Sequence, residues 1–273
     1  MKAREAAAQS AVRLAAAGIP DAKFEAELLA RESAGITRAQ YFLDAPLESE
    51  AEAQLDAFTE RRAQREPAAY ITGHREFFGR DFAVGPGVLI PRPETELLVE
   101  LALADLDEEP GAIVLEVGTG SGAAAISVAA ERPAARVIAT EISPEAMAFA
   151  RLNAARHSTG VHFVLGDLAT PVRQADIVLA NLPYIPTWEI EALEPEVSKW
   201  EPLVALDGGH DGFVLIRRLV EDCASRLRPR LLVLEVAFGQ AAGVAAILAG
   251  YGVNPWTRKD LTGIDRVVCC RWR

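Results

Sequence analysis

The sequence has few of the residues that most directly identify a metal site or a disulfide-linked fold. Its 273 residues include only three cysteines, Cys223, Cys269 and Cys270. They form no CxxC pair and no cysteine–histidine cluster, so we interpret them as buried thiols in a reducing cytosol. We therefore expect neither a bound metal nor a disulfide.

The chain also lacks long apolar runs and an excess of basic residues. The N-terminal stretch MKAREAAAQS has no secretory apolar region, and the most apolar stretch, VAFGQAAGVAAILAGYGV, is too rich in Ala and Gly to span a membrane. With 28 Lys and Arg against 39 Asp and Glu, the net charge is −11, which disfavours a broad nucleic-acid surface. We expect a cytoplasmic protein that binds no membrane and no nucleic acid directly.

Residues 1–75 have the pattern of a small helical bundle. Apolar residues recur at helical spacing in Ala-rich segments, and charged residues fill the remaining positions. We expect four or five helices that form an N-terminal domain, with the charges on a solvated face. This part carries no catalytic pattern of its own.

Between residues 76 and 92 we expect a β-hairpin junction. Glycines divide this stretch into short pieces, of which RDFAV and GVLI are predicted strands. In the IPRPET segment two prolines flank Arg92 and make a stiff connection. A second domain, residues 93–273, follows.

Strands and helices alternate from about residue 110 onward. Six segments have the length and composition of strands: AIVLEVG, ARVIATEI, VHFVLGD, ADIVLAN, LLVLEVA and the C-terminal DRVVCCRWR, which suits an edge position. Such alternation predicts an α/β fold with a parallel, doubly wound sheet. Ligands of these sheets bind beyond the carboxyl ends of the strands, so the residues that follow each strand are the candidate site.

The first predicted strand ends in a glycine-rich turn, LEVGTGSGAAA. Gly118, Gly120 and Gly122 alternate with other residues, which permits a tight turn and lets a ligand approach the backbone. The helix that follows offers free N–H groups at its N-terminus. A nucleotide cofactor fits this turn, but GxGxG alone separates NAD from S-adenosylmethionine (AdoMet) only weakly.

The second and third strands end in acidic residues. Glu141 stands about 20 positions after the first glycine, where a carboxylate can accept both hydroxyls of a ribose. Asp167 can accept a hydrogen bond from an adenine amine, and Leu168 can cover the face of the ring. Taken singly, each is also an ordinary residue of a turn; together with the glycine turn they favour a nucleotide site.

The fourth strand ends in NLPY, which separates the two cofactors. A methyltransferase that acts on a planar –NH₂ group needs acceptors for both N–H protons, because the nitrogen lone pair is delocalised. The side-chain oxygen of Asn181 is one acceptor, and the backbone carbonyl of Leu182 is a second. Pro183 restricts the backbone of Leu182 to an extended conformation and so directs this carbonyl. Tyr184 offers a ring to stack on the planar group. We expect catalysis by positioning, without a covalent intermediate.

The motif order GxGxG, acid, GD, N-x-P-Y resembles the class I AdoMet-dependent amino-methyltransferases. Two longer segments are more specific: PAAYITGHREFFGRDFAVGPGVLIPRPETELLVE and EPLVALDGGHDGFVLIRRLV closely resemble the peptide chain release factor N5-glutamine methyltransferases of the HemK/PrmC family. The ending DLTGIDRVV fits the closing hairpin of that family. The resemblance covers nearly the whole chain and is weakest in residues 1–65.

This resemblance implies a helical N-terminal domain, a hairpin junction and a seven-stranded, mostly parallel methyltransferase sheet. It implies methyl transfer from AdoMet to N5 of the glutamine in the Gly-Gly-Gln motif of class 1 release factors, which supports translation termination. The release factor would then be the protein partner, which we expect the N-terminal helices to bind. We expect the chain to act as a monomer.

The resemblance also assigns individual residues by position. Contacts to AdoMet are implied for Gly118, Thr119, Gly120, Ser121, Gly122, Glu141, Leu168 and Asn181. Contacts to the reacting glutamine are implied for Asn181, Leu182, Pro183 and Tyr184, with Arg92 bordering the pocket. The sequence departs from the family at three positions: Leu182 replaces a usual Pro, Glu141 a commoner Asp, and Leu168 a frequent aromatic residue.

Three other functions remain open on the sequence alone. An N6-adenine methyltransferase acting on rRNA or DNA is favoured by the N-L-P-Y spelling and opposed by the acidic charge and the two long segments. An NAD-dependent oxidoreductase is opposed by the missing GxGxxG and by the NLPY quartet. A protein that binds AdoMet or a release factor without catalysis is opposed by the intact Asn181 and Tyr184.

Overall fold

The computed structural model describes residues 1–108 and 111–272, in two compact units. The first unit comprises Met1–His74 together with Glu194–Trp200. The second comprises Arg75–Leu193 together with Glu201–Arg273. The short segment from the second half of the chain that joins the first unit was not expected from the sequence.

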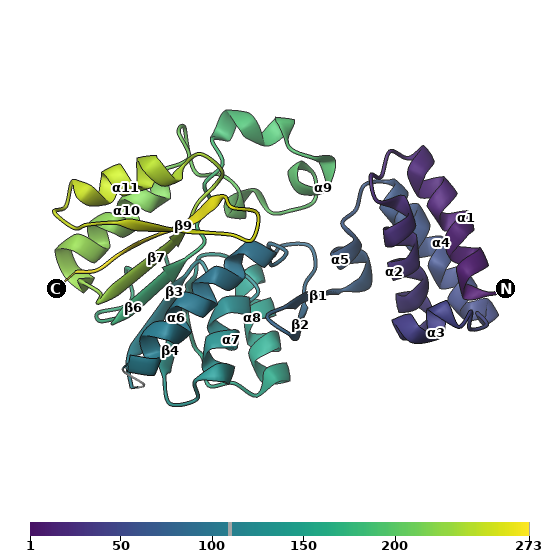
Figure 1. The fold of residues 1–273 in the computed structure, drawn as a ribbon, viewed down its shortest axis with the longest axis horizontal. Coiled ribbons are helices and arrows are strands. Elements are labelled where there is room, and N and C mark those ends of the chain that lie inside the picture. Colours follow the sequence, from purple (N-terminus) through teal and green to yellow (C-terminus); the bar gives the residue numbers. More distant parts are fainter. Residues whose placement is uncertain (109–110, 273) are drawn as a thin grey trace. The chain divides into compact units, whose positions relative to one another are not determined.

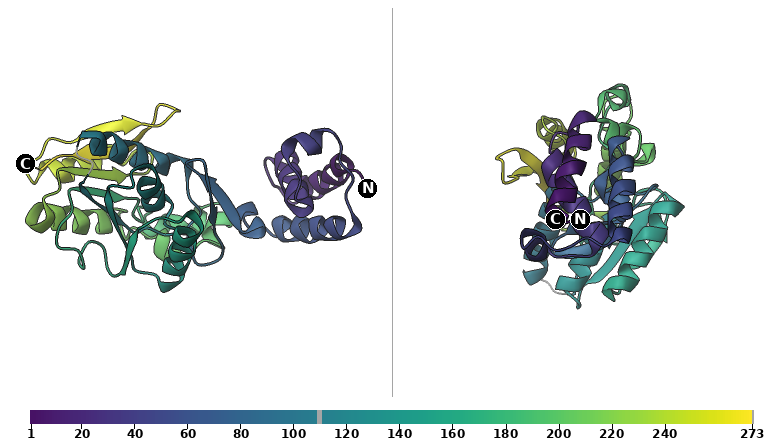
Figure 2. Two further views of the ribbon diagram at one scale, coloured as in Figure 1. Left: turned by 90° about the horizontal axis from the view of Figure 1, so that it is seen from below. Right: turned by 90° about the vertical axis from the view of Figure 1, so that its right-hand side faces the viewer.

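The first unit is helical, as predicted. Its elements are α1 (Ala3–Ala16), α2 (Ala22–Ala34), α3 (Arg38–Phe42), α4 (Ser49–Ala63), α5 (Ala68–Thr72) and the short α9 (Pro195–Ser198). Helices α1, α2 and α4 pack on one another around the buried Leu14, Leu29 and Leu55 (Figure 2, purple to blue). Apolar residues at helical spacing thus form a separate small core.

Ion pairs hold the segment Glu194–Trp200 in this unit. Arg62 is only 4% exposed and donates to the carboxylates of both Glu25 and Glu196. Arg65 donates to the other oxygen of Glu196, at 2.7 Å. A buried guanidinium needs such partners, because an unpaired buried charge is costly.

A two-stranded hairpin begins the second part of the chain. It consists of β1 (His74–Phe77) and β2 (Arg80–Ala83). The RDFAV strand is confirmed, but the GVLI strand is wrong: residues 87–90 form no strand, and the hairpin lies earlier in the chain. Val88 and Ile90 are buried, yet Gly87 has a φ of +98°, which interrupts an extended conformation.

The main sheet has seven strands in the order β5-β4-β3-β6-β7-β9-β8. These are β3 (Ile113–Val117), β4 (Arg136–Glu141), β5 (His162–Leu165), β6 (Ile177–Ala180), β7 (Leu231–Glu235), β8 (Trp256–Lys259) and β9 (Asp265–Cys270). The first five in this order are parallel, and β9 is antiparallel to both of its neighbours. A mostly parallel, seven-stranded sheet is therefore confirmed.

The expected edge position of the C-terminal strand is wrong. β9 lies between β7 and β8, and its residues Val267–Cys270 are fully buried. The edge is β8, whose four residues are all exposed. Because β8 has no buried face, its sequence lacks the alternation that identifies a strand. Cys223, Cys269 and Cys270 are buried free thiols, as expected.

Helices cover both faces of the sheet, as a doubly wound fold requires. The helices α6 (Glu96–Glu108), α7 (Ala123–Glu131) and α8 (Pro144–His157) lie on one face, and α10 (Val214–Asp222) and α11 (Ala241–Ala249) on the other (Figure 1). Alternate strand residues enter the two cores: Val114 and Val233 face α6 and α7, whereas Leu115 and Leu232 face α10 and α11. Among the described residues, no helix combines the length and apolarity that crossing a membrane requires.

Short helical turns complete the second unit. They are η1 (Pro93–Thr95), η2 (Thr187–Ala192), η3 (Leu203–Ala205) and η4 (Cys223–Leu227). Both η1 and η3 contribute residues to the wall of the cavity described next.

Candidate active site

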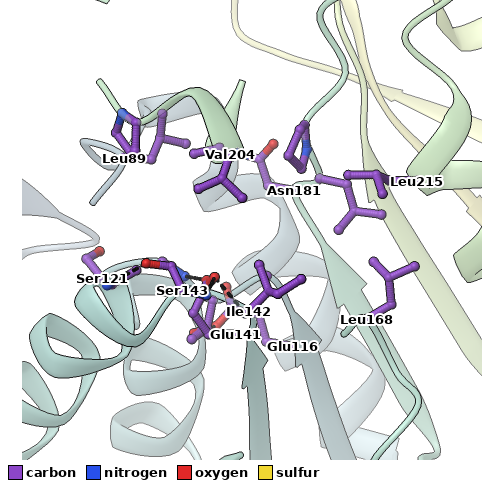
Figure 3. Close-up of a pocket in the computed structure, with 18 of the residues that line it drawn as sticks. Leu89, Glu116, Ser121, Glu141, Ile142, Ser143, Leu168, Asn181, Val204 and Leu215 are labelled. Carbon is purple, nitrogen blue, oxygen red and sulfur yellow. Dashed lines mark hydrogen bonds between the residues drawn. The ribbon is translucent and has the colours of Figure 1, made fainter. Parts of the chain in front are cut away.

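A cavity of about 550 Å³ opens at the carboxyl ends of the parallel strands. This volume is typical of a site for a small molecule or cofactor. Glu116 and Glu141 lie on one side of it, and Leu89 and Val204 on the opposite side (Figure 3). Eleven of the residues predicted from the sequence line it: Arg92, Gly118, Thr119, Gly120, Ser121, Glu141, Asp167, Leu168, Asn181, Leu182 and Pro183. Gly122 and Tyr184 do not.

The glycine turn is fixed by backbone hydrogen bonds to the next strand. The N–H groups of Gly118 and Thr119 both donate to the carbonyl of Thr140, at 2.9 and 3.0 Å. Gly122 has a φ of +82°, and a Cβ atom there would lie 2.8 Å from Ile126 Cδ1. The third glycine therefore allows the start of α7 to pack closely, and it does not form the cavity wall.

Glu116 is a residue of this site that the sequence reasoning missed. It is 5% exposed, lines the cavity and accepts hydrogen bonds from Thr119 Oγ1 and from the N–H of Ala125. Burial raises the pKa of its carboxyl to about 7, although both hydrogen bonds lower it. The available signal was an acid within the otherwise apolar run IVLEV.

Glu141 is held by three backbone N–H groups. Its Oε1 accepts from Ile142 and Ser143, at 2.8 and 2.9 Å, and its Oε2 accepts from Gly120 at 2.9 Å. A carboxylate has about four lone-pair positions, so one position on Oε2 remains. A ribose hydroxyl can use that position; a second hydroxyl would have to share or displace an existing bond.

Asp167 and Leu168 both line the cavity. The Asp167 carboxylate pairs with Arg218, which also lines the cavity and was not anticipated. Leu168 is 9% exposed and has a φ of +48°, a backbone conformation that residues other than glycine rarely adopt. Such local strain is often found at ligand sites, and here it accompanies a side chain in the cavity wall.

Asn181 lies immediately after β6, with its side chain tied to Thr95. The Asn181 Nδ2 donates to Thr95 Oγ1 at 3.1 Å, and Thr95 Oγ1 donates to Glu235 Oε2 at 2.7 Å. Leu182 is 3% exposed and packs towards Gly118. Asn181, Leu182 and Pro183 thus line the cavity together. Their contact with a substrate amide stays a prediction.

The structure does not bring Tyr184 to the cavity. Its half-buried ring packs against the core that α10 and α11 share with the sheet. Burial, followed by the charge of Glu235, raises the pKa of its hydroxyl to about 12, so it stays protonated at neutral pH. Its carbonyl accepts from Gln240 Nε2 at 2.8 Å. Stacking of this ring on a substrate stays a prediction.

Arg92 lines the cavity and forms an ion pair with the buried Glu201. Its Nη2 donates to both oxygens of Glu201, at 2.8 and 2.7 Å. Burial raises the pKa of Glu201, and the guanidinium of Arg92 opposes that rise. The ion pair fixes a positive charge at the border of the cavity.

The cavity fits a nucleoside-bearing cofactor. The turn at Gly118 and Gly120 presents no side chain, Glu141 keeps an acceptor position, and Leu168 supplies an apolar surface. No group of three or more His, Cys, Asp or Glu suited to a metal occurs in the described part of the chain.

Comparisons with known proteins agree with this geometry. Residues 114–200 match a family described as a methyltransferase domain, and residues 5–73 match the PrmC N-terminal domain. The solved hMettl16 catalytic domain has a TM-score of 0.57 at 14% identity, covering 83% of each chain. The T. thermophilus 16S rRNA N2 G1207 methyltransferase, RsmC, has a TM-score of 0.52 at 20% identity, covering 73% of this chain and 50% of that one. The fold is therefore that of the class I methyltransferases.

Curated relatives identify the family. The release factor glutamine methyltransferase of Cereibacter sphaeroides is 41% identical over 278 residues, 99% of each chain. That of Geobacter sulfurreducens is 41% identical over 261 residues, 93% of this chain and 91% of the relative. The chain belongs to the release factor glutamine methyltransferase family.

Proposed function

We propose that this protein transfers a methyl group from AdoMet to the side-chain amide nitrogen, N5, of the glutamine in the Gly-Gly-Gln motif of class 1 release factors. The observation that carries the proposal is Asn181 in the cavity wall, with its Nδ2 bound to Thr95. Because Nδ2 is used there, Oδ1 remains as the acceptor for a substrate N–H. The family to which the chain belongs supports glutamine as the substrate.

AdoMet would be held by the residues at the ends of β3, β4 and β5. The glycine turn lets the cofactor approach the backbone, Glu141 accepts a ribose hydroxyl through Oε2, and Asp167 and Leu168 adjoin the base. When bound, AdoMet supplies a methyl group on a sulfonium sulfur, which retains the electron pair of the broken S–C bond. The other steps depend on residues of this chain.

The substrate amide would be held by the quartet after β6. Asn181 Oδ1 and the Leu182 carbonyl accept the two N–H groups, which frees the nitrogen lone pair from the planar amide and directs it towards the methyl carbon. The nitrogen gains the methyl group and then loses one proton to solvent. Arg92, fixed by Glu201, would orient the rest of the glutamine.

The test is incubation of the full-length protein with labelled AdoMet and a purified class 1 release factor. Mass spectrometry of the Gly-Gly-Gln peptide should show one added methyl group on the glutamine. Asn181→Ala should lower kcat by about 10²-fold or more, because a preorganised contact to the reacting group is lost. Its AdoMet affinity, measured by calorimetry, should change little. Methylation of rRNA or DNA alone would overturn the proposal.

The helical unit is our candidate for the release-factor-binding domain. Several apolar side chains on it are more than half exposed and available to a partner: Phe24, Phe42 and Leu43. Phe24→Ser and Leu43→Ser should raise the KM for the release factor and leave AdoMet affinity unchanged. We place the reaction in the cytoplasm, where release factors act, and propose that the chain works as a monomer, which sedimentation at micromolar concentration would check.

A further inference from the structure

Glu235 is a buried acid that the proposed mechanism does not use. It is 2% exposed and does not line the cavity. Burying a carboxyl group is costly unless it is hydrogen-bonded. Its partner is Thr95 Oγ1, at 2.7 Å, which in turn accepts from Asn181.

The sheet register places this acid beside the catalytic strand end. In the parallel pair β6–β7 the last paired residues are Ala180 and Leu234. Asn181 and Glu235 follow directly, at the carboxyl ends of neighbouring strands. Thr95, from η1, is hydrogen-bonded to both side chains. Three distant segments therefore supply one continuous hydrogen-bond chain.

The number of available hydrogen atoms fixes which group donates in each hydrogen bond between Asn181, Thr95 and Glu235. A threonine hydroxyl has a single hydrogen, and an ionised carboxylate can only accept. With Glu235 ionised, the Thr95 hydrogen is committed to it, so the Thr95 oxygen can only accept from Asn181. The Nδ2 edge of the Asn181 amide then faces Thr95. If the amide were turned over, two oxygens would face each other with no hydrogen between them.

We propose that Glu235 is a positioning residue that, through Thr95, holds the Asn181 amide with its oxygen towards the substrate. The inference rests on the proposed function, since it explains how the acceptor for the substrate N–H is kept in place. Protonated Glu235 can donate to Thr95 and free the threonine hydrogen. Both orientations of the Asn181 amide can then form a hydrogen bond with Thr95. In the turned orientation, Asn181 Oδ1 no longer faces the substrate N–H.

The charges around Glu235 define the pH at which this happens. Burial raises the pKa of Glu235 to about 7; the Thr95 hydrogen bond lowers it, the charge of Glu94 raises it, and Arg266 and Arg92 lower it. The neighbouring Tyr184 keeps its proton in this range. The rate at saturating substrates should therefore fall as the pH drops through about 7.

The experiment measures kcat and KM for the release factor, at saturating AdoMet, across about pH 6 to 9. Wild type should lose activity about tenfold on the acid side, as expected for the loss of one hydrogen bond to a charged group. Glu235→Gln and Thr95→Val should each lower kcat about tenfold at pH 8 and give a flat profile. Thr95→Ser, which keeps the hydroxyl, should restore both the rate and the pH dependence.

Two controls separate positioning from simple structural damage. Asp105→Asn removes a buried carboxylate that pairs with Arg230 outside the cavity, and it should lower stability while leaving the pH profile of kcat unchanged. Glu116, in the cavity wall, is the other acid whose pKa is raised to about 7. In Glu116→Gln the fall of kcat at low pH should therefore persist when AdoMet is saturating. The double variant of Thr95→Val with Glu235→Gln should cost no more than either single variant.

A readout independent of activity is the titration of Glu235 itself. The carboxyl band that infrared difference spectra assign to Glu235, by its absence in Glu235→Gln, should titrate near pH 7 and shift to higher pH in Thr95→Val. A wild-type rate and pH profile in Glu235→Gln would overturn the inference, as would an unshifted titration in Thr95→Val. Failure of wild type to methylate the release factor would overturn the proposed function instead, and the titration would still decide whether Glu235 and Thr95 are coupled.

Discussion

Gly208 packs directly against the backbone of Tyr184. A Cβ atom at residue 208 would lie 2.8 Å from Tyr184 Cα and 2.8 Å from the carbonyl oxygen of Pro183, closer than real Cβ contacts. The N–H of Gly208 donates to the carbonyl of Ile185 at 2.8 Å. The segment DGGHDG, residues 207–212, thus packs against the backbone of the NLPY quartet and fixes its position.

Gly208→Ala should therefore damage catalysis more than cofactor binding. The added methyl group has to displace the backbone of Pro183 and Tyr184. A misplacement of the reacting group by about 1 Å costs about 10²-fold in kcat. AdoMet affinity by calorimetry should stay within about threefold, because the glycine turn is untouched. Gly160→Ala is the matched control, since no atom beyond its chain neighbours lies within 4 Å of the methyl group that it would add. Equal activity of the two variants would contradict this role of Gly208.

The strand ends of this site could be predicted because each follows a strong apolar run. Parallel strands bring their carboxyl ends to one edge of the sheet, so Gly118, Glu141, Leu168 and Asn181 meet although they are far apart in the chain. Gly118 and Asn181 directly follow a strand, Glu141 ends one, and Leu168 follows one within three residues, so their placement needed no knowledge of side-chain packing.

The supporting residues could not be predicted in the same way. Thr95 bonds to Glu235, 140 residues later in the chain, and no local pattern connects them. Glu116 and Glu235 look like defects in apolar strands until their partners are known. The edge strand β8 lacks a recognisable pattern because all of its residues are exposed, and GVLI has the composition of a strand although its buried residues Val88 and Ile90 lie outside any strand.

Leu168→Ala should weaken AdoMet binding without slowing the chemical step. Leu168 is 9% exposed within the cavity wall, and its loss removes apolar contact worth about 1–2 kcal/mol, or about 5- to 30-fold in affinity. Calorimetry of AdoMet binding measures this directly, and kcat at saturating AdoMet should remain close to that of wild type.

Leu165→Ala serves as the control for this substitution. Leu165 ends β5, is 52% exposed and does not line the cavity, so AdoMet affinity should not change. Unaltered affinity in Leu168→Ala as well would show that the apolar surface of the cavity does not contact the cofactor.

The stability of the protein should respond to the proton on Glu116. The pKa of this carboxyl is about 7 in the folded protein, mainly because of burial, against an ordinary value of 4.5. Between these two pH values the folded state binds more protons than the unfolded state, so the contribution of Glu116 to stability is lost as the pH rises. Glu116→Gln should remove this loss, because its amide is neutral and its Oε1 can still accept from Thr119 and Ala125.

Urea unfolding at several pH values between about 4.5 and 8 provides the measurement. The difference in unfolding free energy between Glu116→Gln and wild type should move in favour of the variant as the pH rises from 4.5 to about 7, and then stay constant. Comparing variant with wild type cancels the contributions of the carboxylates whose pKa values are lowered: Asp211, Asp260 and Glu196. A difference that does not change with pH would contradict the raised pKa of Glu116.

The ion pairs of Glu196 should decide whether the segment Glu194–Trp200 stays ordered in the helical unit. Arg62 is 4% exposed and is shared between Glu25 and Glu196, so Glu196→Gln leaves the buried guanidinium with one carboxylate. The loss should destabilise this unit by about 1–3 kcal/mol. Amide hydrogen exchange in residues 194–200 should then become faster, whereas Glu191→Gln, an exposed acid in η2, should leave it unchanged. Equal exchange of this segment in wild type and in Glu196→Gln would show that the ion pairs of Glu196 do not hold it.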